Sequence, residues 1–275
     1  MRAFLWATAA WALPALLSCS HPTPGPVVAD PPPAVDQPPA QQSADALRQL
    51  AEQLWHARLE QDWAAIFPFQ DPKSVEDVTE ADFVAWCEAE EPFHILEYRL
   101  GDVRISDGMG WVEVHSRTAM RRFPDIPPRD TYRWEKWRLL EDRWYPVPPR
   151  QLEEYPASPA QRDAAEEQRL LARFEESWEA RQAGDWDRLF QLSDPRTRSD
   201  IPRDEFAEAQ GLIEYLSRNV RWVEVIGERG NIRVEVLHKL TDPSLTKLSP
   251  KTAVVTERWV KVENEWYRDL TIANQ

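Results

Sequence analysis

The chain has 275 residues, with 47 acidic side chains against 33 lysines and arginines and a formal net charge of −14 at pH 7. Affinity for nucleic acid depends on neutralising phosphates with basic side chains, so this balance excludes a nucleic-acid partner from our expectations. It equally argues against adhesion of the folded surface to anionic lipid.

The first residues of the chain are typical of an export signal. Arg2 precedes an apolar run from Ala3 to Leu17, which has the length of a signal-peptide hydrophobic region and is shorter than the ~20 residues of a membrane-spanning helix. The stretch Leu-Leu-Ser-Cys that ends at Cys19 resembles a bacterial lipoprotein lipobox. This resemblance implies cleavage before Cys19 and a diacylglycerol on its sulfur. An ordinary secreted protein with a cysteine at this place is the alternative.

Residues 1–19 are therefore assigned to a lipoprotein signal peptide, with Cys19 as the lipidation site. The protein is expected in the bacterial cell envelope, outside the cytoplasm, with the lipid as its membrane contact. In a diderm source, Ser20 after the cysteine would imply an outer-membrane anchor facing the periplasm.

Residues 20–43 are predicted to form a disordered tether. Eight prolines fall between Pro22 and Pro39, and the segment has too little apolar surface to offset the entropy of ordering it. Recognition of these prolines by a partner protein is the alternative.

The rest of the chain contains one unit twice. The pair Asp62-Trp63 recurs as Asp185-Trp186, an offset of 123 residues, and the offset becomes 122 further along the chain. The recurring positions include Trp55 and Trp178, Phe67 and Phe190, Phe83 and Phe206, Val112–Val114 and Val234–Val236, Trp137 and Trp259, and Trp144 and Trp266. Such a long period indicates a duplicated domain rather than a solenoid. We predict domains at 44–150 and 163–275, joined by a proline-containing linker at 151–162.

Each unit is expected to begin with three helices. Apolar residues at helical spacing predict amphipathic helices over 44–61 and 164–183. Asp62 and Asp185 suit the N-cap of a short second helix, and Gly184 suits the left-handed end of the helix before it. A third helix is predicted from Thr79 in the first unit and over 204–216 in the second.

Four strands are expected after the helices of each unit. They cover 93–105, 110–120, 131–141 and 142–147 in the first, and 219–228, 231–240, 252–263 and 264–272 in the second. These segments are rich in β-branched and aromatic residues, and the short breaks between them favour antiparallel hairpins.

Both units of the chain resemble the NTF2-like (SnoaL-like) superfamily. The resemblance is carried by the QDW and GDW motifs after the first helices, by the following Asp71-Pro72 and Asp194-Pro195, and by the closing hairpins from Trp137 to Tyr145 and from Trp259 to Tyr267. It implies an α+β fold of two tandem cone-shaped domains, each with three N-terminal helices packed on a curved antiparallel sheet of about four strands. A cystatin-like fold, with a single helix on a sheet, is the nearest rival.

No catalytic or metal-binding motif is found. The five histidines show no metal-ligand spacing, and there is no nucleophile elbow, phosphate-binding loop or dinucleotide-binding loop. Cys87 is expected to be a small buried residue. We expect no catalytic residue, metal or cofactor, although the superfamily includes enzymes.

Tryptophan is the remaining anomaly, with 14 in the chain. Eight recur as pairs between the units and are expected to pack the cores. The unpaired ones beyond the signal peptide are the candidate pocket aromatics: Trp86, Trp111, Trp134 and Trp222.

The sequence thus favours a membrane-anchored, extracytoplasmic lipoprotein that works as a non-catalytic ligand-binding or protein-interaction module. Its expected partners are the membrane, and a small apolar ligand or an envelope protein. The alternatives are an isomerase, dehydratase or hydrolase using a buried acid or base in one cone, and a purely structural envelope protein.

Overall fold

The computed structural model describes residues 43–241 and 249–270. The predictions for the signal peptide, for Cys19 and for nearly all of the tether lie outside the described residues. Among the described residues, no helix is both long enough and apolar enough to cross a membrane.

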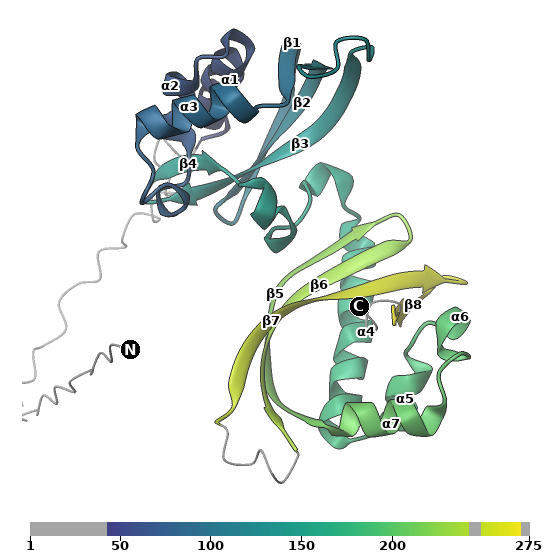
Figure 1. Ribbon diagram of the computed structural model, residues 1–275. Coiled ribbons are helices and arrows are strands. Elements are labelled where there is room, and N and C mark those ends of the chain that lie inside the picture. Colours follow the sequence, from purple (N-terminus) through teal and green to yellow (C-terminus); the bar gives the residue numbers. More distant parts are fainter. Residues whose placement is uncertain (1–42, 242–248, 271–275) are drawn as a thin grey trace, which may run out of the picture. The chain divides into compact units, whose positions relative to one another are not determined.

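The chain contains two sets of helices, each followed by its own antiparallel sheet (Figure 1). The first half comprises α1 (Ala44–Glu60), α2 (Trp63–Ile66), η2 (Phe67–Phe69), η3 (Pro72–Ser74), α3 (Glu80–Glu90), β1 (Phe93–Ser106), β2 (Met109–Met120), β3 (Arg129–Leu140) and β4 (Arg143–Pro146). The second half comprises α4 (Ala164–Ala183), α5 (Trp186–Gln191), α6 (Pro195–Arg198), α7 (Arg203–Gly211), β5 (Ile213–Ile226), β6 (Arg229–Leu240), β7 (Lys251–Val262) and β8 (Glu265–Arg268). Both sheets have four strands in sequential order, which confirms the predicted α+β layout of two antiparallel meanders.

The aspartates of the QDW and GDW motifs cap the second helix of each half. Asp62 Oδ1 accepts the backbone N–H of Ala65 at 3.0 Å, and Asp185 Oδ1 accepts that of Arg188 at 2.9 Å. The residue before each cap ends the long helix in a left-handed conformation, Gln61 at φ 56° and Gly184 at φ 66°. The motif is therefore the junction between two helices, as predicted.

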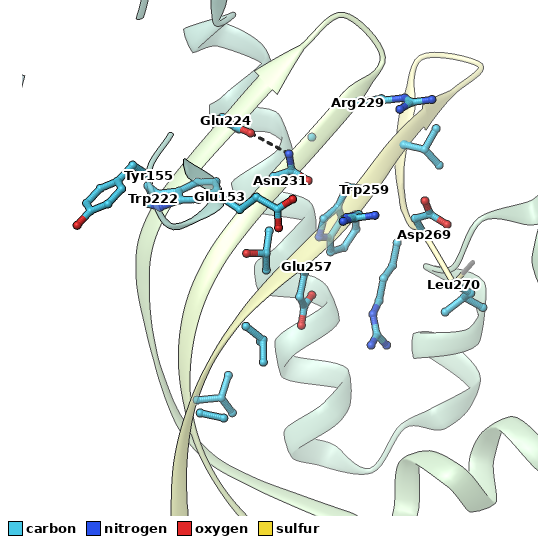
Figure 2. Close-up of a pocket in the computed structure, with 18 of the residues that line it drawn as sticks. Glu153, Tyr155, Trp222, Glu224, Arg229, Asn231, Glu257, Trp259, Asp269 and Leu270 are labelled. Atoms are coloured by element: carbon cyan, nitrogen blue, oxygen red, sulfur yellow. Dashed lines mark hydrogen bonds between the residues drawn. The ribbon is translucent and has the colours of Figure 1, made fainter. Parts of the chain in front are cut away.

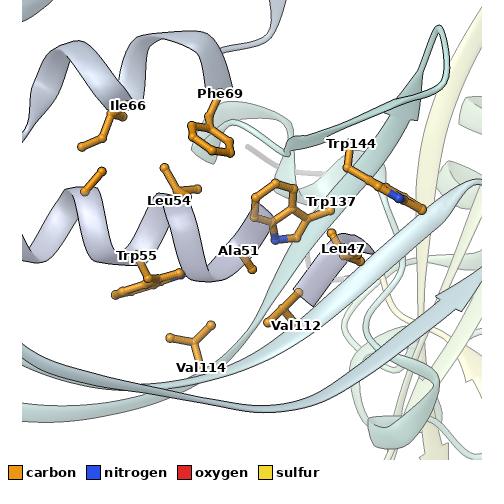
Figure 3. Packing of buried hydrophobic residues seen from close by; sticks show 11 residues of the cluster. Leu47, Ala51, Leu54, Trp55, Ile66, Phe69, Val112, Val114, Trp137 and Trp144 are labelled. Atoms are coloured by element: carbon orange, nitrogen blue, oxygen red, sulfur yellow. The ribbon is translucent and has the colours of Figure 1, made fainter. Parts of the chain in front are cut away.

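The recurring tryptophans form the core of each half. Trp55, Trp137 and Trp144 in the first, and their counterparts in the second, are at most 2% exposed. Figure 3 shows how Trp55 on α1 and Trp137 on β3 meet apolar residues of the helices and strands. The hydrophobic face of the long helix is thus buried against one face of its own sheet.

Both sheets curl because their first strands carry matching bulges. The pairing of β1 with β2 shifts between Ile95 and Glu97 and again after Leu100, and that of β5 with β6 shifts between Tyr215 and Ser217 and again after Val220. Each shift adds one residue to the outer strand, which bends it and increases its twist. The result is a curved sheet with the long helix in its hollow (Figure 1).

The predicted end of the third helix in the second half was wrong. We expected helix as far as Leu216, but α7 ends at Gly211 and β5 begins at Ile213. In the first half Pro92 separates helix from strand, whereas the second half has no such marker. Ile213 and Tyr215 instead pair with Leu240 and His238 of β6, so tertiary pairing determines where the strand begins.

The alignment of the second strands was also wrong. Equivalent residues of β2 and β6 are 120 positions apart rather than 122, because Gly110 and Gly230 occupy equivalent places in the two sheets. A Cβ on Gly110 would lie 2.3 Å from Leu47 Cδ2, and one on Gly230 would lie 2.4 Å from Leu170 Cδ2. Each glycine lets the long helix of its half approach the sheet.

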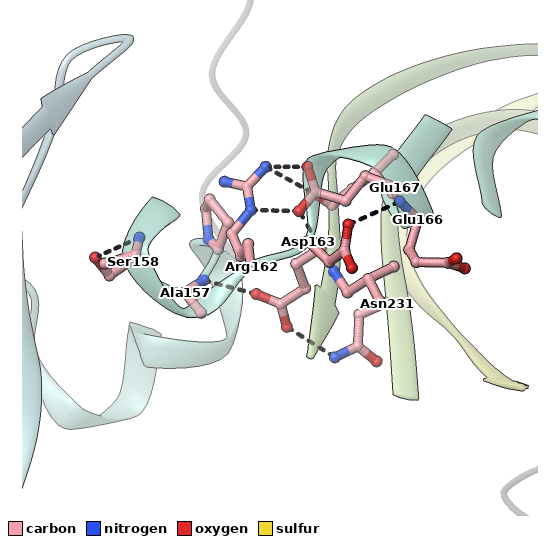
Figure 4. A network of polar contacts seen from close by, with 12 residues as sticks. Ala157, Ser158, Arg162, Asp163, Glu166, Glu167 and Asn231 are labelled. Carbon is pink, nitrogen blue, oxygen red and sulfur yellow. Dashed lines mark hydrogen bonds and ion pairs between the residues drawn. The ribbon is translucent and has the colours of Figure 1, made fainter. Parts of the chain in front are cut away.

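The segment predicted as a linker is held by many polar contacts. It contains η4 (Pro149–Glu154) and η5 (Pro159–Gln161). Arg162 donates to both carboxylate oxygens of Glu167 on α4, and Glu224 on β5 accepts from the Ala157 N–H and from Asn231 (Figure 4). These contacts fix the path of the segment into the second half.

Candidate binding site in the second half

An ion pair joins the long helix to the third strand in both halves, and it is buried in the second half and partly buried in the first. In the second half, Arg181 from the last turn of α4 meets Glu257 of β7, and in the first half Arg58 of α1 meets Glu135 of β3. The sequence offered a signal for these acids, since Glu135 and Glu257 each stand two residues before a recurring tryptophan. Sequence reasoning did not single them out.

The pair in the second half has the geometry of a guanidinium fork. Arg181 Nη1 donates to Glu257 Oε1 at 2.6 Å, and Nη2 donates to Oε2 at 3.0 Å. The Arg181 side chain is 1% exposed and that of Glu257 10%. The Arg181 guanidinium also lies 5.5 Å from the centre of the Tyr215 ring. Two parallel charge-assisted bonds fix both partners in orientation.

A second arginine, Arg268 at the end of β8, contributes a further positive charge beside this pair. Burial would raise the pKa of the Glu257 carboxyl, but the charges of Arg181 and Arg268 outweigh it, and the pKa lies below its ordinary value. Burial, and then the charge of Arg181, lower the pKa of Arg268. Nη1 of Arg268 is buried and has no hydrogen-bond partner within the described part of the chain.

Glu257 and Arg268 line part of a cavity of about 1440 Å³, whose lining also includes residues of the opposite face of the sheet, such as Glu224 and Asn231 (Figure 2). Glu257, Trp259 and Arg268 line it from β7 and β8, and Tyr215 lines it from β5. Val255, which shares the face of Glu257 on β7, also lines it and is 41% exposed, although it points into the hollow of the sheet. On the opposite face of the sheet, the lining includes Trp222 and residues of the 152–155 segment. The hollow of the second sheet is therefore accessible.

The first half arranges the same charges differently. Glu135 accepts from Arg58 Nη1 at 2.7 Å and from Trp55 Nε1 at 3.0 Å. The second arginine of the first half, Arg133, is the counterpart of Val255 and lies 5.1 Å from the centre of the Trp55 ring. The counterpart of Arg268 is Pro146. Arg133 thus lies on the core tryptophan at the position where the second half has a valine. In the second half Arg218 of β5 lies over Trp178, 5.1 Å from the centre of the ring.

A smaller cavity of about 460 Å³ lies on the first sheet, where Tyr98, Ser116, Thr131 and Tyr132 are among its lining residues. His115 also lines it, with Nε2 3.2 Å from Glu113 Oε1 and its ring against Tyr132. This cavity does not include the Arg58–Glu135 pair. It is the weaker candidate because it lacks a buried charged group.

The four candidate pocket tryptophans lie at different places. Trp86 is 59% exposed on α3. Trp111 is buried, and its Nε1 donates to the Pro156 carbonyl at 3.1 Å. Trp134 packs beside Trp111, and its Nε1 donates to the Tyr132 hydroxyl. Trp222 lines the larger cavity and donates to the Glu154 carbonyl at 2.8 Å.

Cys87 is buried, as expected, and burial together with the charge of Glu91 raises the pKa of its thiol to about 11. Within residues 43–241 and 249–270, no group of three or more histidines, cysteines and acids is placed to hold a metal ion.

No protein-family model and no curated protein match this sequence. Three solved structures show partial likeness. A SEC-C motif containing protein from Rhodopseudomonas palustris is 16% identical, with a TM-score of 0.31 over 36% of this chain and 73% of its own. A protein of unknown function with a cystatin-like fold from Nostoc punctiforme is 10% identical, with a TM-score of 0.30 over 40% of this chain and 92% of its own. An NTF2-like protein involved in plasmid conjugation is 10% identical, with a TM-score of 0.27 over 64% of this chain and 75% of its own.

Proposed function

We propose that the protein is a lipid-anchored, extracytoplasmic binding module made of two tandem cone-shaped NTF2-like domains. The second domain takes a small ligand in the hollow of its sheet and does not act as a catalyst. The observation that carries this proposal is the accessible cavity beside the buried Arg181–Glu257 pair. A concave site with apolar walls and a few fixed polar groups is the usual form of a small-molecule site.

The state of Glu257 argues against the alternative of an acid–base enzyme. A general acid or base works best with a pKa near the working pH, which requires a carboxyl whose pKa is raised. The pKa of Glu257 is instead lowered, and both of its oxygens accept from Arg181. Such a carboxylate holds an arginine in place and is poorly suited to carry protons.

The membrane anchor is tested by Cys19→Ala. Because the thioether to lipid forms on the cysteine sulfur, this change is expected to abolish acylation and release the protein from membranes. Metabolic labelling with a fatty acid and fractionation of cells measure the two effects. Cys87→Ala is the matched control and should leave both unchanged. Retention of the Cys19→Ala protein in the membrane fraction would contradict the anchor.

Ligand binding in the hollow is tested by a pair of neighbouring substitutions on β7. Val255→Arg introduces the residue that the first half carries at this position, and its side chain would enter the cavity. Val254→Arg is the matched control, since Val254 points to the other face and is 46% exposed. We expect a panel of neutral, anionic and cationic small molecules to include binders, detected by saturation-transfer NMR on the full chain in lipid nanodiscs. Val255→Arg should weaken them and Val254→Arg should not. The proposal fails if no compound binds, or if the two variants behave alike.

A further inference from the structure

The floor of the second hollow carries one more positive charge than negative charge. Arg181 and Arg268 stand beside the single carboxylate of Glu257. Other charged residues of the lining, such as Glu224 and Arg258, lie on the opposite face of the sheet. Arg218, which faces the hollow, is paired with Glu175 of α4. The excess is therefore local to the floor, where burial makes a charge costly unless it is matched.

Both oxygens of Glu257 are already engaged by Arg181, so the charge of Arg268 has no carboxylate of its own at the floor. Nη1 of Arg268 is buried without a hydrogen-bond partner among the described residues. Trp259 Nε1 is also buried without a hydrogen-bond partner among the described residues. Its counterpart in the first half, Trp137 Nε1, is unpartnered among them too, so this indole does not distinguish the two hollows. Within the described ranges, Ser177 Oγ, Trp178 Nε1 and Arg181 Nε are buried without a partner as well. Among these atoms of the described residues, Arg268 Nη1 is the one that belongs to a charged side chain lining the cavity.

Arg268 is not needed by the fold as such. In the first half Pro146 occupies the same place, paired with Trp137 as Arg268 is paired with Trp259. A buried arginine with a free donor at a position where the other half has a proline indicates recognition of an acceptor.

The walls beside this charge are apolar. Ile213 of β5, Val236 of β6, and Ala253 and Val255 of β7 all line the cavity. They alternate along their strands with residues of the outer face, so their side chains share the hollow with Tyr215 and Glu257. A ligand that fits both features has one acidic group and an apolar body.

We propose that the hollow of the second sheet binds an organic monocarboxylate, whose carboxylate is held by Arg268 while its apolar body lies along strands β5 to β7. This inference rests on the proposed binding function and names its ligand class. A carboxylate matches the planar guanidinium fork, and its single negative charge equals the local excess. A phosphate dianion would exceed that charge beside Glu257, which makes it the poorer match.

The test compares three probes of one shape on the full chain in lipid nanodiscs: cyclohexanecarboxylate, cyclohexanecarboxamide and cyclohexylmethylamine. Calorimetry should show the carboxylate binding about tenfold or more tightly than the amide, since hydrogen bonds to charged groups are worth that much. The amine should bind most weakly. Arg268→Gln should lower the affinity for cyclohexanecarboxylate to that for cyclohexanecarboxamide. Arg229→Gln, which changes an exposed arginine at the rim of the same cavity, should keep the preference.

The outcomes separate this inference from the binding function on which it rests. If the amide binds as tightly as the carboxylate in the unchanged protein, the carboxylate inference is overturned and binding in the hollow stands. A preference that survives Arg268→Gln also overturns it. If none of the three probes binds while other compounds of the wider panel do, the carboxylate inference is contradicted and the binding function stands. Circular dichroism establishes that Arg268→Gln is folded, and Arg268→Lys, which keeps the charge without the fork, should retain part of the preference.

Discussion

Glu257 keeps a fully buried guanidinium in place, and its own ionisation depends on that role. Glu257→Gln would remove the negative charge beside Arg181, whose side chain is 1% exposed. Leaving one member of a buried ion pair uncompensated costs about 3–5 kcal/mol. We expect a loss of that order in the free energy of unfolding, measured with urea. Glu265→Gln, an exposed change on β8, should alter it by less than about 0.5 kcal/mol. Equal effects of the two changes would contradict the role given to Glu257.

The unfolding free energy lost in Glu257→Gln should depend on pH in a defined direction. Because the pKa of Glu257 is lowered in the folded state, its ionised form contributes stability that is fully present above the unfolded pKa of about 4.3. That contribution disappears as the pH falls through the lower, folded pKa. The difference between the unchanged protein and Glu257→Gln should therefore be constant near neutral pH and shrink below about pH 4. A difference that grows on acidification would contradict this assignment.

Residue-scale features were predictable where they depend on near neighbours in the chain. The caps at Asp62 and Asp185 each follow from one side chain and the N–H group three residues on. The Arg181–Glu257 pair spans 76 residues, and no local pattern reports which arginine meets which acid. The unpartnered donor of Arg268 is also a property of the assembled core, so the sequence could not reveal it.

At the scale of elements, the contact between the long helix and the second strand depends on a glycine. A Cβ at Gly230 would lie 2.4 Å from Leu170 Cδ2 and 3.3 Å from Trp266 Cζ3, both in fully packed surroundings. Gly230→Ala should therefore cost about 1–3 kcal/mol of unfolding free energy through overpacking. Gly211→Ala is the matched control, because its nearest neighbour would be 4.0 Å away.

A double variant distinguishes overpacking from a lost backbone preference. If Leu170 is the group that obstructs the new methyl, Gly230→Ala and Leu170→Ala together should cost less than the sum of their separate effects. Strict additivity in urea unfolding would count against the close approach of α4 to β6.

Elements were predictable where the chain marks their ends. The long helices and the four strands of each half were found from periodicity and turn residues, whereas only Leu212 separates α7 from β5, with no proline between them. The shift to an offset of 120 in the second strands was hidden by the chance recurrence of Val-Glu-Val at 112–114 and 234–236. The strand pairing, which sets Gly110 opposite Trp137 and Gly230 opposite Trp259, and the packing of both glycines against a leucine of the long helix show the correct equivalence.

For the whole molecule, the two halves share a skeleton and differ in what they place in the hollow. The recurring tryptophans and the arginine–glutamate pair are kept, while Arg133 in one half and Arg268 in the other supply the second positive charge from different strands. The exchange places Val255 where the first half has Arg133, while Arg218 of β5 lies 5.1 Å from the centre of the Trp178 ring. What separates the hollow of the second half is therefore Arg268 and the exposed Val255, and not a bare tryptophan face.

The segment between the halves belongs structurally to both of them, and this changes how the chain should be divided. Lys136 Nζ donates to the carbonyls of Leu152 and Tyr155, and the buried Trp111 donates to that of Pro156. A fragment of residues 44–150 lacks these acceptors, leaving Trp111 with a buried donor unpaired or newly exposed to water.

We therefore expect fragment 44–158 to fold and to be more stable than fragment 44–150 by about 2 kcal/mol or more, since several hydrogen bonds and the packing of Tyr155 are restored. Urea unfolding measures the difference, and red-shifted tryptophan emission should accompany the shorter fragment. Trp111→Phe is the internal control: it removes the indole donor, so lengthening the fragment from 150 to 158 should then stabilise it less. Equal stability of the two unchanged fragments would show that residues 151–158 are only a connection.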